Sequence, residues 1–365
     1  MPRVLFVGRG RLTLPLRPWL QKKWDALSDV FELRVLNAGS GGGDSRFHLL
    51  PAAAPAFYPR LPLDVARELR RFKPDVVVAS DPFVGAGVLA GRSLARSRAR
   101  VIVEVHGDPN TFARSYGSPL RRTVAPLTDA VARFSLRRAD ATRALSAFTS
   151  SVVGNARGLP ATASFPTYSD LEAFAAPPPV AVPTDRRIVF VGALEEYKNI
   201  DGLAVSWRSV AKRVSDARLT IIGRGSRRAV VDRLVAEVPG VEHVESLEPD
   251  GVLGRIDDAR ALVLPSWPEG LGRVVLEAFA RGRTVVATDA GGIPDIVTDG
   301  RDGILVPRAD VHALTDAVCR VLEDHELAVR LGAAARETYG AWHQTAASFA
   351  ESYRDLVERV LAGAR

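Results

Sequence analysis

The chain has 365 residues, of which 47% are hydrophobic and 25% are charged, and its formal net charge is +7. This length predicts two domains, the composition is that of a globular protein, and no apolar run reaches the roughly 18 residues of a membrane span. The single cysteine, Cys319, excludes an internal disulfide, and no Cys/His cluster indicates zinc. The N-terminal segment lacks the pattern of a signal peptide, so we expect a cytoplasmic protein.

The positive charge is concentrated in the first half of the chain. Residues 1–180 contain 25 Lys and Arg against 14 Asp and Glu, whereas residues 181–365 contain 24 against 28. Such asymmetry indicates an anionic partner for the first half, such as a membrane surface, a phosphorylated acceptor or a nucleic acid. A solvated, arginine-rich surface is the alternative, because only five of the 49 basic residues are lysine.

Strand-like and helix-like segments alternate along the first half. Strands are predicted at Val4–Gly8, Phe31–Leu36, Val76–Ala79 and Val101–Val105, and a helix at Pro62–Phe72. This alternation predicts a parallel sheet with helices on both faces, whose ligands bind at the carboxyl ends of the strands. Gly8, Ser80-Asp81 and His106 all lie at such ends.

The proline-rich stretch 176–187 predicts a linker, after which the alternation starts again. Further strands are predicted at Ile188–Val191, Leu219–Ile222, Ala261–Leu264 and Thr284–Ala287, and helices at Val311–Leu322, Glu326–Tyr339 and about Thr345–Leu361. We therefore expect two doubly wound α/β domains facing a central cleft, at residues 1–175 and 188–340.

The segment Pro265–Glu277, PSWPEGLGRVVLE, carries the clearest functional pattern. A strand ends just before it, and a helix is predicted from Arg273 onward. Gly270 and Gly272 allow the backbone to approach a ligand closely, and the free N–H groups of a helix start favour a phosphate. The carboxylates of Glu269 and Glu277 suit the paired hydroxyls of a sugar or a ribose.

This segment and its continuation resemble the C-terminal signature of glycosyltransferase family 4, the retaining, nucleotide-sugar-dependent GT-B enzymes. The family's Glu-x7-Glu motif matches Glu269 and Glu277, and the match continues through Ala290–Asp295 and Asp302–Pro307. The resemblance implies a GT-B fold with two Rossmann-like domains, and a last helix at about 345–361 that packs back on the first domain.

The resemblance also implies roles for individual residues. Glu269 would contact the donor sugar, Gly270, Leu271 and Gly272 would offer backbone amides to the sugar and diphosphate, and Glu277 would bind the ribose. Lys198, in VGALEEYKNID, matches the lysine that neutralises the donor diphosphate.

One position departs from the family pattern. Ala193 stands where the family often has an arginine that makes a second contact with the diphosphate. Arg224, Arg9 and Arg11 are candidates to replace it, although surface positions would suit them equally. The departure leaves open weak activity or an unusual donor.

The first domain holds the remaining candidates. His106 resembles the family histidine near the donor sugar, and Asp108, Asn110 and Arg114 just beyond it are candidates for acceptor contacts. The family places a glycine-rich loop near the diphosphate, which here corresponds to the predicted loop with Gly8 and Gly10. This loop lacks the GxGxxG pattern of a dehydrogenase.

Two basic stretches of the first domain predict a membrane-facing surface. One contains Arg67, Arg70, Arg71 and Lys73, and the other contains Arg121, Arg122, Arg137 and Arg138 among apolar residues. An ordinary helix packed on the sheet is the alternative for the second stretch.

Together these features predict a retaining hexosyltransferase of polysaccharide or glycolipid biosynthesis. It would move a sugar from a nucleoside diphosphate to the hydroxyl of a glycan, lipid-linked or small-molecule acceptor, without a metal or other cofactor. It would be cytoplasmic, with peripheral contact to an anionic membrane surface and no nucleic acid partner. The alternatives are a pseudo-glycosyltransferase, a transferase for a small natural product, and a weakly active nucleotide-sugar-binding protein.

Overall fold

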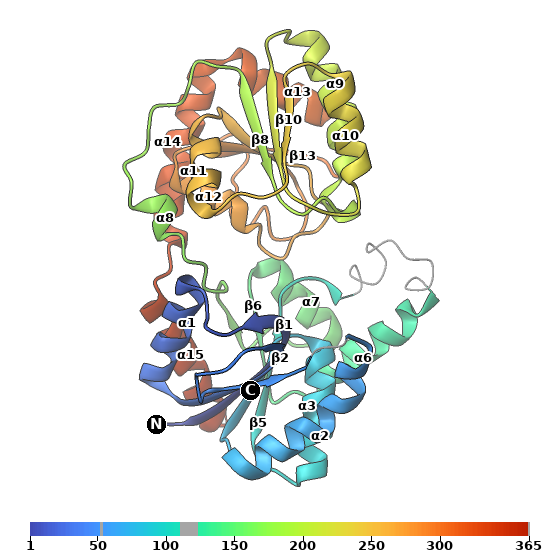
Figure 1. Cartoon of the computed structure of the whole chain (residues 1–365), viewed down its shortest axis with the longest axis vertical. Coiled ribbons are helices and arrows are strands. Elements are labelled where there is room, and N and C mark those ends of the chain that lie inside the picture. Colours follow the sequence, from blue (N-terminus) through green and yellow to red (C-terminus); the bar gives the residue numbers. More distant parts are fainter. Residues whose placement is uncertain (52–53, 110–122, 364–365) are drawn as a thin grey trace. The chain divides into compact units, whose positions relative to one another are not determined.

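The computed structural model describes residues 1–51, 54–109 and 123–363, which divide into two compact units (Figure 1). The first unit contains the described residues between Met1 and Ser169 and those from Gln344 onward, and the second contains Asp170–His343. The chain therefore passes between the units twice. Among the described residues, no helix is both long enough and apolar enough to cross a membrane.

A seven-stranded parallel sheet forms the centre of the first unit, in the order β3-β2-β1-β4-β5-β6-β7. Its strands are β1 (Arg3–Thr13), β2 (Glu32–Ser40), β3 (Phe47–Leu50), β4 (Val76–Ala79), β5 (Arg100–Val105), β6 (Ala141–Ala144) and β7 (Ala163–Ser164). The strands predicted in this half are all present. Continuous runs such as VVVA in β4 are fully buried because helices cover both faces of the sheet.

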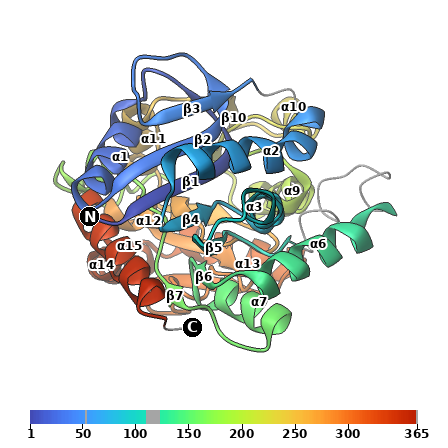
Figure 2. The same ribbon diagram turned by 90° about the horizontal axis from the view of Figure 1, so that it is seen from below.

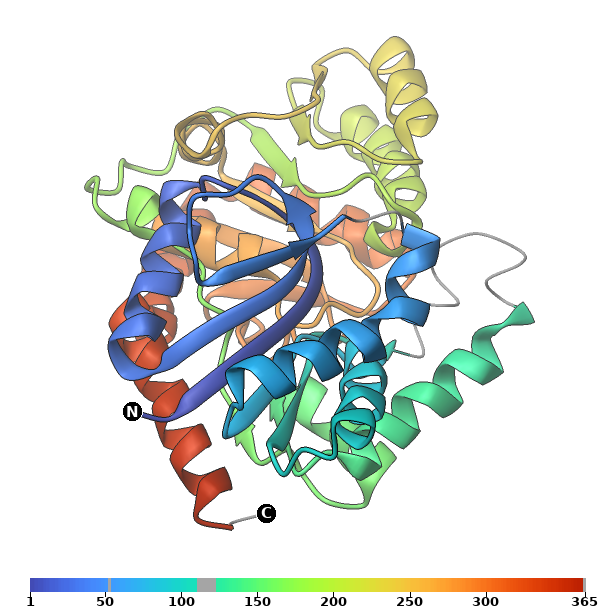
Figure 3. The ribbon, with the colours of Figure 1, turned by 60° about the horizontal axis from the view of Figure 1, so that its bottom comes forward.

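Helices cover both faces of this sheet (Figure 2). A hydrophobic core lies between the sheet and the helices on each face. On one face lie α2 (Ala54–Phe72), α3 (Pro82–Ala95), α6 (Ala125–Arg138) and α7 (Ala147–Arg157), and on the other lie α1 (Pro18–Val30) and α15 (Ala346–Leu361). The C-terminal α15 lies alongside α1 (Figure 3). The ring of its Tyr353 lies edge-on to the ring of Phe6 of β1, with centroids 5.6 Å apart, and its Phe349 belongs to the same core. The last helix thus completes the core of the first unit.

The second unit repeats this plan with a six-stranded parallel sheet, in the order β10-β9-β8-β11-β12-β13. Its strands are β8 (Arg187–Val191), β9 (Arg218–Ile222), β10 (Val241–Val244), β11 (Ala261–Leu264), β12 (Thr284–Thr288) and β13 (Gly303–Val306). One core contains residues of α9 (Ile200–Arg213), α10 (Arg228–Glu237) and α13 (Val311–Glu323). The other contains residues of α8 (Glu172–Ala175), α11 (Pro249–Asp257), α12 (Arg273–Ala280) and α14 (His325–Trp342).

The proline-rich stretch 176–187 is bound to the second unit, whereas the sequence predicts a linker there. Arg281 donates to the carbonyls of Pro177 and Pro178, and Arg283 donates to those of Val180 and Ala181. Both arginine side chains are 1% exposed, so backbone carbonyls of the stretch supply acceptors that these buried cations need. The chain accordingly passes between the units at Ser169, before the predicted linker begins.

The predicted loop at Gly8–Arg11 is part of β1, which continues to Thr13. The register against β2 shifts between Gly8 and Leu12, and pairing resumes at Leu12 with Gly39. A side chain at Gly8 would lie 2.2 Å from Oδ1 of Asn37. The glycine is therefore explained by the close approach of β2, independently of any ligand.

Candidate functional site

The strand order of the second unit reverses between β8 and β11. The chain first adds β9 and β10 on one side of β8, and then adds β11, β12 and β13 on its other side. In sheets of this kind ligands bind at the carboxyl ends of the strands at such a point. The short 3-10 helix η1 (Glu196–Lys198) follows β8, and the loop with Glu269 follows β11. The strand order therefore brings Lys198 and Glu269 together, although they are 71 positions apart in the sequence.

Lys198 and Glu269 form an ion pair at this edge, between the ammonium Nζ and the carboxylate Oε1. Their side chains are only 10% and 14% exposed, so solvent screens the pair weakly. The predicted diphosphate-binding lysine is therefore paired with the predicted sugar-binding glutamate. A phosphate placed here would compete with the carboxylate for the same ammonium group.

The backbone around Glu269 is held by neighbouring loops. The amide of Trp267 donates to the carbonyl of Tyr197 at 2.7 Å, and the amide of Gly292 donates to the carbonyl of Glu269 at 2.8 Å. Gly291 has a φ of +66°, and a side chain there would lie 2.3 Å from the carbonyl oxygen of Glu269. The stretch Ala290-Gly291-Gly292, for which sequence analysis predicted no role, therefore supports the loop that carries Glu269.

Helix α12 begins at Arg273, as predicted, with Gly272 at the N-cap. No side chain caps this helix start, so its first amides remain available to a ligand phosphate. One turn later Glu277, 8% exposed, accepts from Nε of Arg273 at 2.9 Å. Burial raises the pKa of Glu277, and Arg273 opposes this shift.

Other predicted donor-side residues are less constrained. Arg224 is exposed and pairs with Glu245 at 3.2 Å, with a further hydrogen bond to Ser246 at 3.3 Å. Ala193, at the position of the missing arginine, is exposed, and Leu271 is half-buried. The second unit thus gathers Lys198, Glu269 and the start of α12, while the side chain of Arg224 is directed to its acidic neighbour.

The first unit has a pocket of about 550 Å³ at the carboxyl ends of its strands. It is lined by Arg9, Gly10, Arg11, Ala38, Phe57, Tyr58, Ser80, Asp81 and His106. Asp81 accepts from Nε of Arg9 at 2.8 Å, and its other oxygen caps α3 by accepting from the amides of Phe83 and Val84. The pocket therefore combines cations and hydroxyl groups with an apolar wall.

His106 lies at this pocket, directly after β5, with its side chain 41% exposed. Asp108 is half-buried nearby, whereas Asn110 and Arg114 lie outside the described residues. Nε2 of His106 is 3.3 Å from the carboxylate of Glu104, a buried residue that sequence reasoning passed over. An acidic residue inside the apolar run VIVEV was the signal that could have revealed it.

No group of three or more His, Cys, Asp and Glu side chains in the described parts of the chain is arranged to hold a metal ion.

Two family models match the chain, one for each unit. Residues 16–163 match a glycosyl transferase 4-like domain, and residues 185–324 match glycosyl transferases group 1. A D-inositol 3-phosphate glycosyltransferase of Corynebacterium glutamicum is 31% identical over 49% of this chain. The chain spans about half the length of that relative, 46%.

A GDP-mannose-dependent alpha-(1-6)-phosphatidylinositol monomannoside mannosyltransferase of Mycolicibacterium smegmatis is 30% identical over 71% of this chain and 69% of its own length. Two solved structures share the fold over nearly all of both chains. The sucrose-phosphate synthase of Thermosynechococcus elongatus has a TM-score of 0.80 at 18% identity, covering 99% and 100%. Anabaena HepE in complex with UDP-glucose has a TM-score of 0.74 at 16% identity, covering 98% and 100%.

Proposed function

Because the chain belongs to the group 1, glycosyltransferase 4-like family and has the GT-B fold, we propose that it transfers a hexosyl unit from a nucleoside diphosphate sugar to an acceptor hydroxyl. The observation that carries the proposal is the group at the β8/β11 switch point. A buried lysine and an uncapped helix start lie there beside two carboxylates. Cations and free amides suit a diphosphate, and carboxylates suit the sugar and ribose hydroxyls.

The proposed chemistry depends on charge stabilisation of the leaving group. As the bond between the anomeric carbon and the phosphate oxygen breaks, negative charge grows on the diphosphate. Lys198, once the phosphate has displaced Glu269 from its ammonium group, and the amides of Gly272 and Arg273 stabilise that charge. The acceptor oxygen bonds to the anomeric carbon, and its proton passes to the departing phosphate.

We propose retention of the anomeric configuration, with leaving and entering oxygens on the same face of the sugar. This reaction needs neither a nucleophilic carboxylate nor a metal ion, so Glu269 and Glu277 serve as ligands of sugar and ribose. Proton NMR of the product reports its anomeric configuration. An inverted product would contradict this proposal, and loss of turnover in EDTA would contradict the metal-free mechanism.

The donor is best identified by a thermal-shift panel of UDP-, GDP-, ADP- and dTDP-sugars, because a ligand that binds the folded state raises the melting temperature. HepE was solved with UDP-glucose, and the mycolicibacterial relative is named for GDP-mannose, so both bases belong in the panel. At a hundredfold excess over Kd the stabilisation is about 2.7 kcal/mol. No shift with any of the four would count against the proposed activity.

A weakly active sugar-nucleotide-binding protein remains the second candidate, and Ala193 is the observation that favours it. Such a protein would show the thermal shift with little turnover. Ala193→Arg would then strengthen binding of the nucleoside diphosphate, because it restores a cation beside the phosphates.

The acceptor proposed for the first unit is anionic. Residues 1–180 carry the excess of basic residues, and two of them, Arg9 and Arg11, line the pocket beside His106. The two curated relatives are named for an inositol phosphate and for a phosphatidylinositol monomannoside. A phosphate-bearing or lipid-linked acceptor matches this charge, and a small uncharged aglycone is the alternative.

A lipid-linked acceptor would require contact with a membrane, and α6 is the surface that we propose for it. Its exposed side carries Leu127, 67% exposed, and Phe134, 52% exposed, with Arg133, Arg137 and Arg138 beside them. This combination of apolar and basic side chains suits an anionic interface. The stretch at the end of α2 suits it less, because Arg67 pairs with the carboxylate of Asp64 and so adds less net positive charge.

Vesicle co-sedimentation tests the membrane contact. Vesicles with anionic lipid should bind the protein at 0.1 M salt and release it near 1 M, where the Debye length falls from about 10 Å to about 3 Å. Leu127→Ser with Phe134→Ser should weaken binding, whereas Leu63→Ser, at a leucine of α2 that is 54% exposed, should not. Equal binding to neutral vesicles, or none at low salt, would contradict the proposal.

A further inference from the structure

The geometry points to Glu104 as a positioning residue for His106. Its buried carboxylate accepts from Nε2 of His106 and thereby leaves Nδ1 as the ring nitrogen available in the pocket. The inference rests on the proposed function in one respect, that His106 serves the transfer. The arrangement of Glu104 and its partners is independent of which sugar or acceptor is used.

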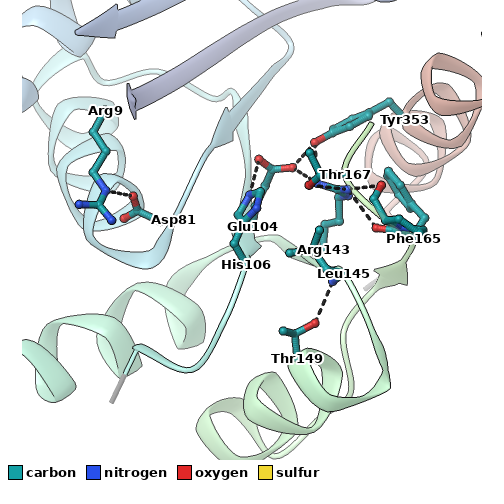
Figure 4. A network of polar contacts seen from close by, with 11 residues as sticks. Arg9, Asp81, Glu104, His106, Arg143, Leu145, Thr149, Phe165, Thr167 and Tyr353 are labelled. Atoms are coloured by element: carbon teal, nitrogen blue, oxygen red, sulfur yellow. Dashed lines mark hydrogen bonds and ion pairs between the residues drawn. The ribbon is translucent and has the colours of Figure 1, made fainter. Parts of the chain in front are cut away.

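The two oxygens of Glu104 have different partners (Figure 4). Oε2 lies 3.3 Å from Nε2 of His106, while Oε1 accepts from Nη1 of Arg143 and from the hydroxyl of Tyr353. If Glu104 served stability alone, its contacts with Arg143 and Tyr353 through Oε1 would be sufficient. The second oxygen is directed instead to the one partner that reaches the pocket.

The partners of Glu104 come from distant parts of the chain. Glu104 on β5 stands opposite Arg143 on β6 in the parallel register, and Tyr353 comes from the middle of α15. Arg143 is 1% exposed, and its Nη2 donates to the carbonyls of Phe165 at 2.9 Å and Pro166 at 2.7 Å. These contacts keep the carboxylate from turning away from His106.

The charge state of Glu104 follows from this environment. Burial opposes ionisation, but Arg143 and the hydrogen bonds from His106 and Tyr353 outweigh it and hold the pKa of Glu104 far below its usual range. An ionised carboxylate only accepts hydrogen bonds, so Nε2 of His106 must carry the hydrogen. In the neutral ring Nδ1 is then an acceptor, suited to a hydroxyl of the sugar or the acceptor.

The position of Arg143 also links His106 to the two places where the chain passes between the units. Phe165 and Pro166 precede the first passage at Ser169, and α15 follows the second passage at Gln344. The last helix therefore contributes to the site through Tyr353, although it lies almost 250 residues from His106 in sequence. Truncation of α15 would remove this support.

The chain offers a matched control for this arrangement. Glu68, 2% exposed, accepts from Nδ1 of His48 at 2.8 Å and pairs with Arg34 at 3.4 Å. This is a second buried carboxylate between a histidine and an arginine. Neither His48 nor Glu68 lines the pocket at His106. Glu68→Gln should therefore leave His106 and turnover unaffected.

The test is nitrogen-15 NMR of the full chain, labelled at its six histidines and recorded with the rings neutral. His106→Gln assigns the signal of His106. The wild type should show the Nε2–H tautomer at His106. In Glu104→Gln the single amide oxygen should stay with Arg143 and Tyr353, so the amide group faces His106 and the tautomer shifts to Nδ1–H. A wild-type Nδ1–H tautomer, or no change in a folded Glu104→Gln variant, would overturn the inference.

Turnover supplies the second readout. Glu104→Gln should lower kcat by about 10-fold to 100-fold and leave the donor KM within about threefold, as expected for a group acting through a general acid, base or ligand. In the background of His106→Ala the same substitution should change kcat less than twofold. Equal losses in both backgrounds would show a merely structural role.

A Glu104→Gln variant that fails to fold leaves the wild-type tautomer and Tyr353→Phe as the deciding measurements. Tyr353→Phe keeps the ring packing and removes one donor to Glu104, so kcat should fall several-fold while Tm changes little. An unchanged kcat would overturn the inference. The expected tautomer without transfer from any nucleotide sugar would instead refute the proposed function.

Discussion

Replacement of Lys198 by methionine tests the proposed donor site most directly. The side chain is 10% exposed and its ammonium group pairs with Glu269 at the β8/β11 switch point. Methionine keeps most of the volume of the side chain and removes the charge. We expect a large fall in turnover with a modest fall in stability.

The expected magnitude follows from the position of the ammonium group. At about 4 Å, with an effective dielectric constant of about 20, two unit charges interact by about 4 kcal/mol. Removal of one preorganised group that stabilises transition-state charge costs about 2.7–4 kcal/mol, or about 10²–10³ in kcat. The variant also leaves the carboxylate of Glu269 without its partner, which costs about 1–3 kcal/mol of folding stability.

The assay compares kcat at saturating donor with Tm for Lys198→Met and for Lys212→Met. Lys212 is an exposed lysine of α9 and serves as the matched control, with no expected change in either quantity. If Lys198→Met keeps turnover within about twofold, which is under about 0.5 kcal/mol, the assigned role of Lys198 is wrong. A fall in kcat fully explained by unfolding at the assay temperature would refute it equally.

Four further substitutions test other parts of the structure. Glu277→Gln should weaken donor binding at least tenfold in calorimetry without lowering Tm, because burial disfavours the carboxylate that it removes; unchanged affinity would exclude Glu277 from the donor site. Gly291→Ala should displace the loop that carries Glu269 and lower kcat more than tenfold, because the added Cβ would lie 2.3 Å from the carbonyl oxygen of Glu269; normal turnover would contradict this clash. Arg281→Met should lower the free energy of unfolding by about 1–3 kcal/mol in urea titrations, because it removes the donor to the carbonyls of Pro177 and Pro178 and the nearer of the two cations at the half-buried Asp257. Burial lowers the pKa of Lys23 from 10.5 to about 8. Between pH 8 and pH 10.5 the unfolded chain therefore holds a proton at Lys23 that the folded chain has released. The free energy of unfolding consequently rises with pH over this range. Lys23→Met should therefore be more stable than the wild type at pH 7, with a gain that shrinks from pH 8 to 10.5; a gain that does not depend on pH would contradict this.

The strands of both sheets were the most predictable part of the fold. Val76–Ala79 and Ala261–Leu264 have the predicted bounds, because a short apolar run of β-branched and aliphatic residues suits a strand buried on both faces. The sequence did not reveal β6, ATRA, since its buried Arg143 interrupts the apolar pattern. Burial of that arginine depends on Glu104, Tyr353 and two carbonyls that local pattern does not contain.

The binding of the stretch 176–187 could not be predicted for a related reason. Its prolines indicate only that it forms neither a helix nor a central strand. Three arginines far along the chain, Arg260, Arg281 and Arg283, supply the donors that hold it to the second unit. Local composition predicted an irregular segment, and only tertiary contacts decided that the segment is attached.

The same distinction between local sequence and tertiary contacts applies to the candidate site. The sequence by itself determined the residue types at the strand ends, Lys198 after β8, the Glu269 loop after β11 and His106 after β5, because strand-end position follows from local pattern. Tertiary structure decided which of these residues meet. Sheet order placed Lys198 against Glu269, and the return of α15 to the first unit placed Tyr353 beside Glu104. Such pairings depend on strand order and helix packing, which are set by the burial of whole faces rather than by any short stretch of sequence.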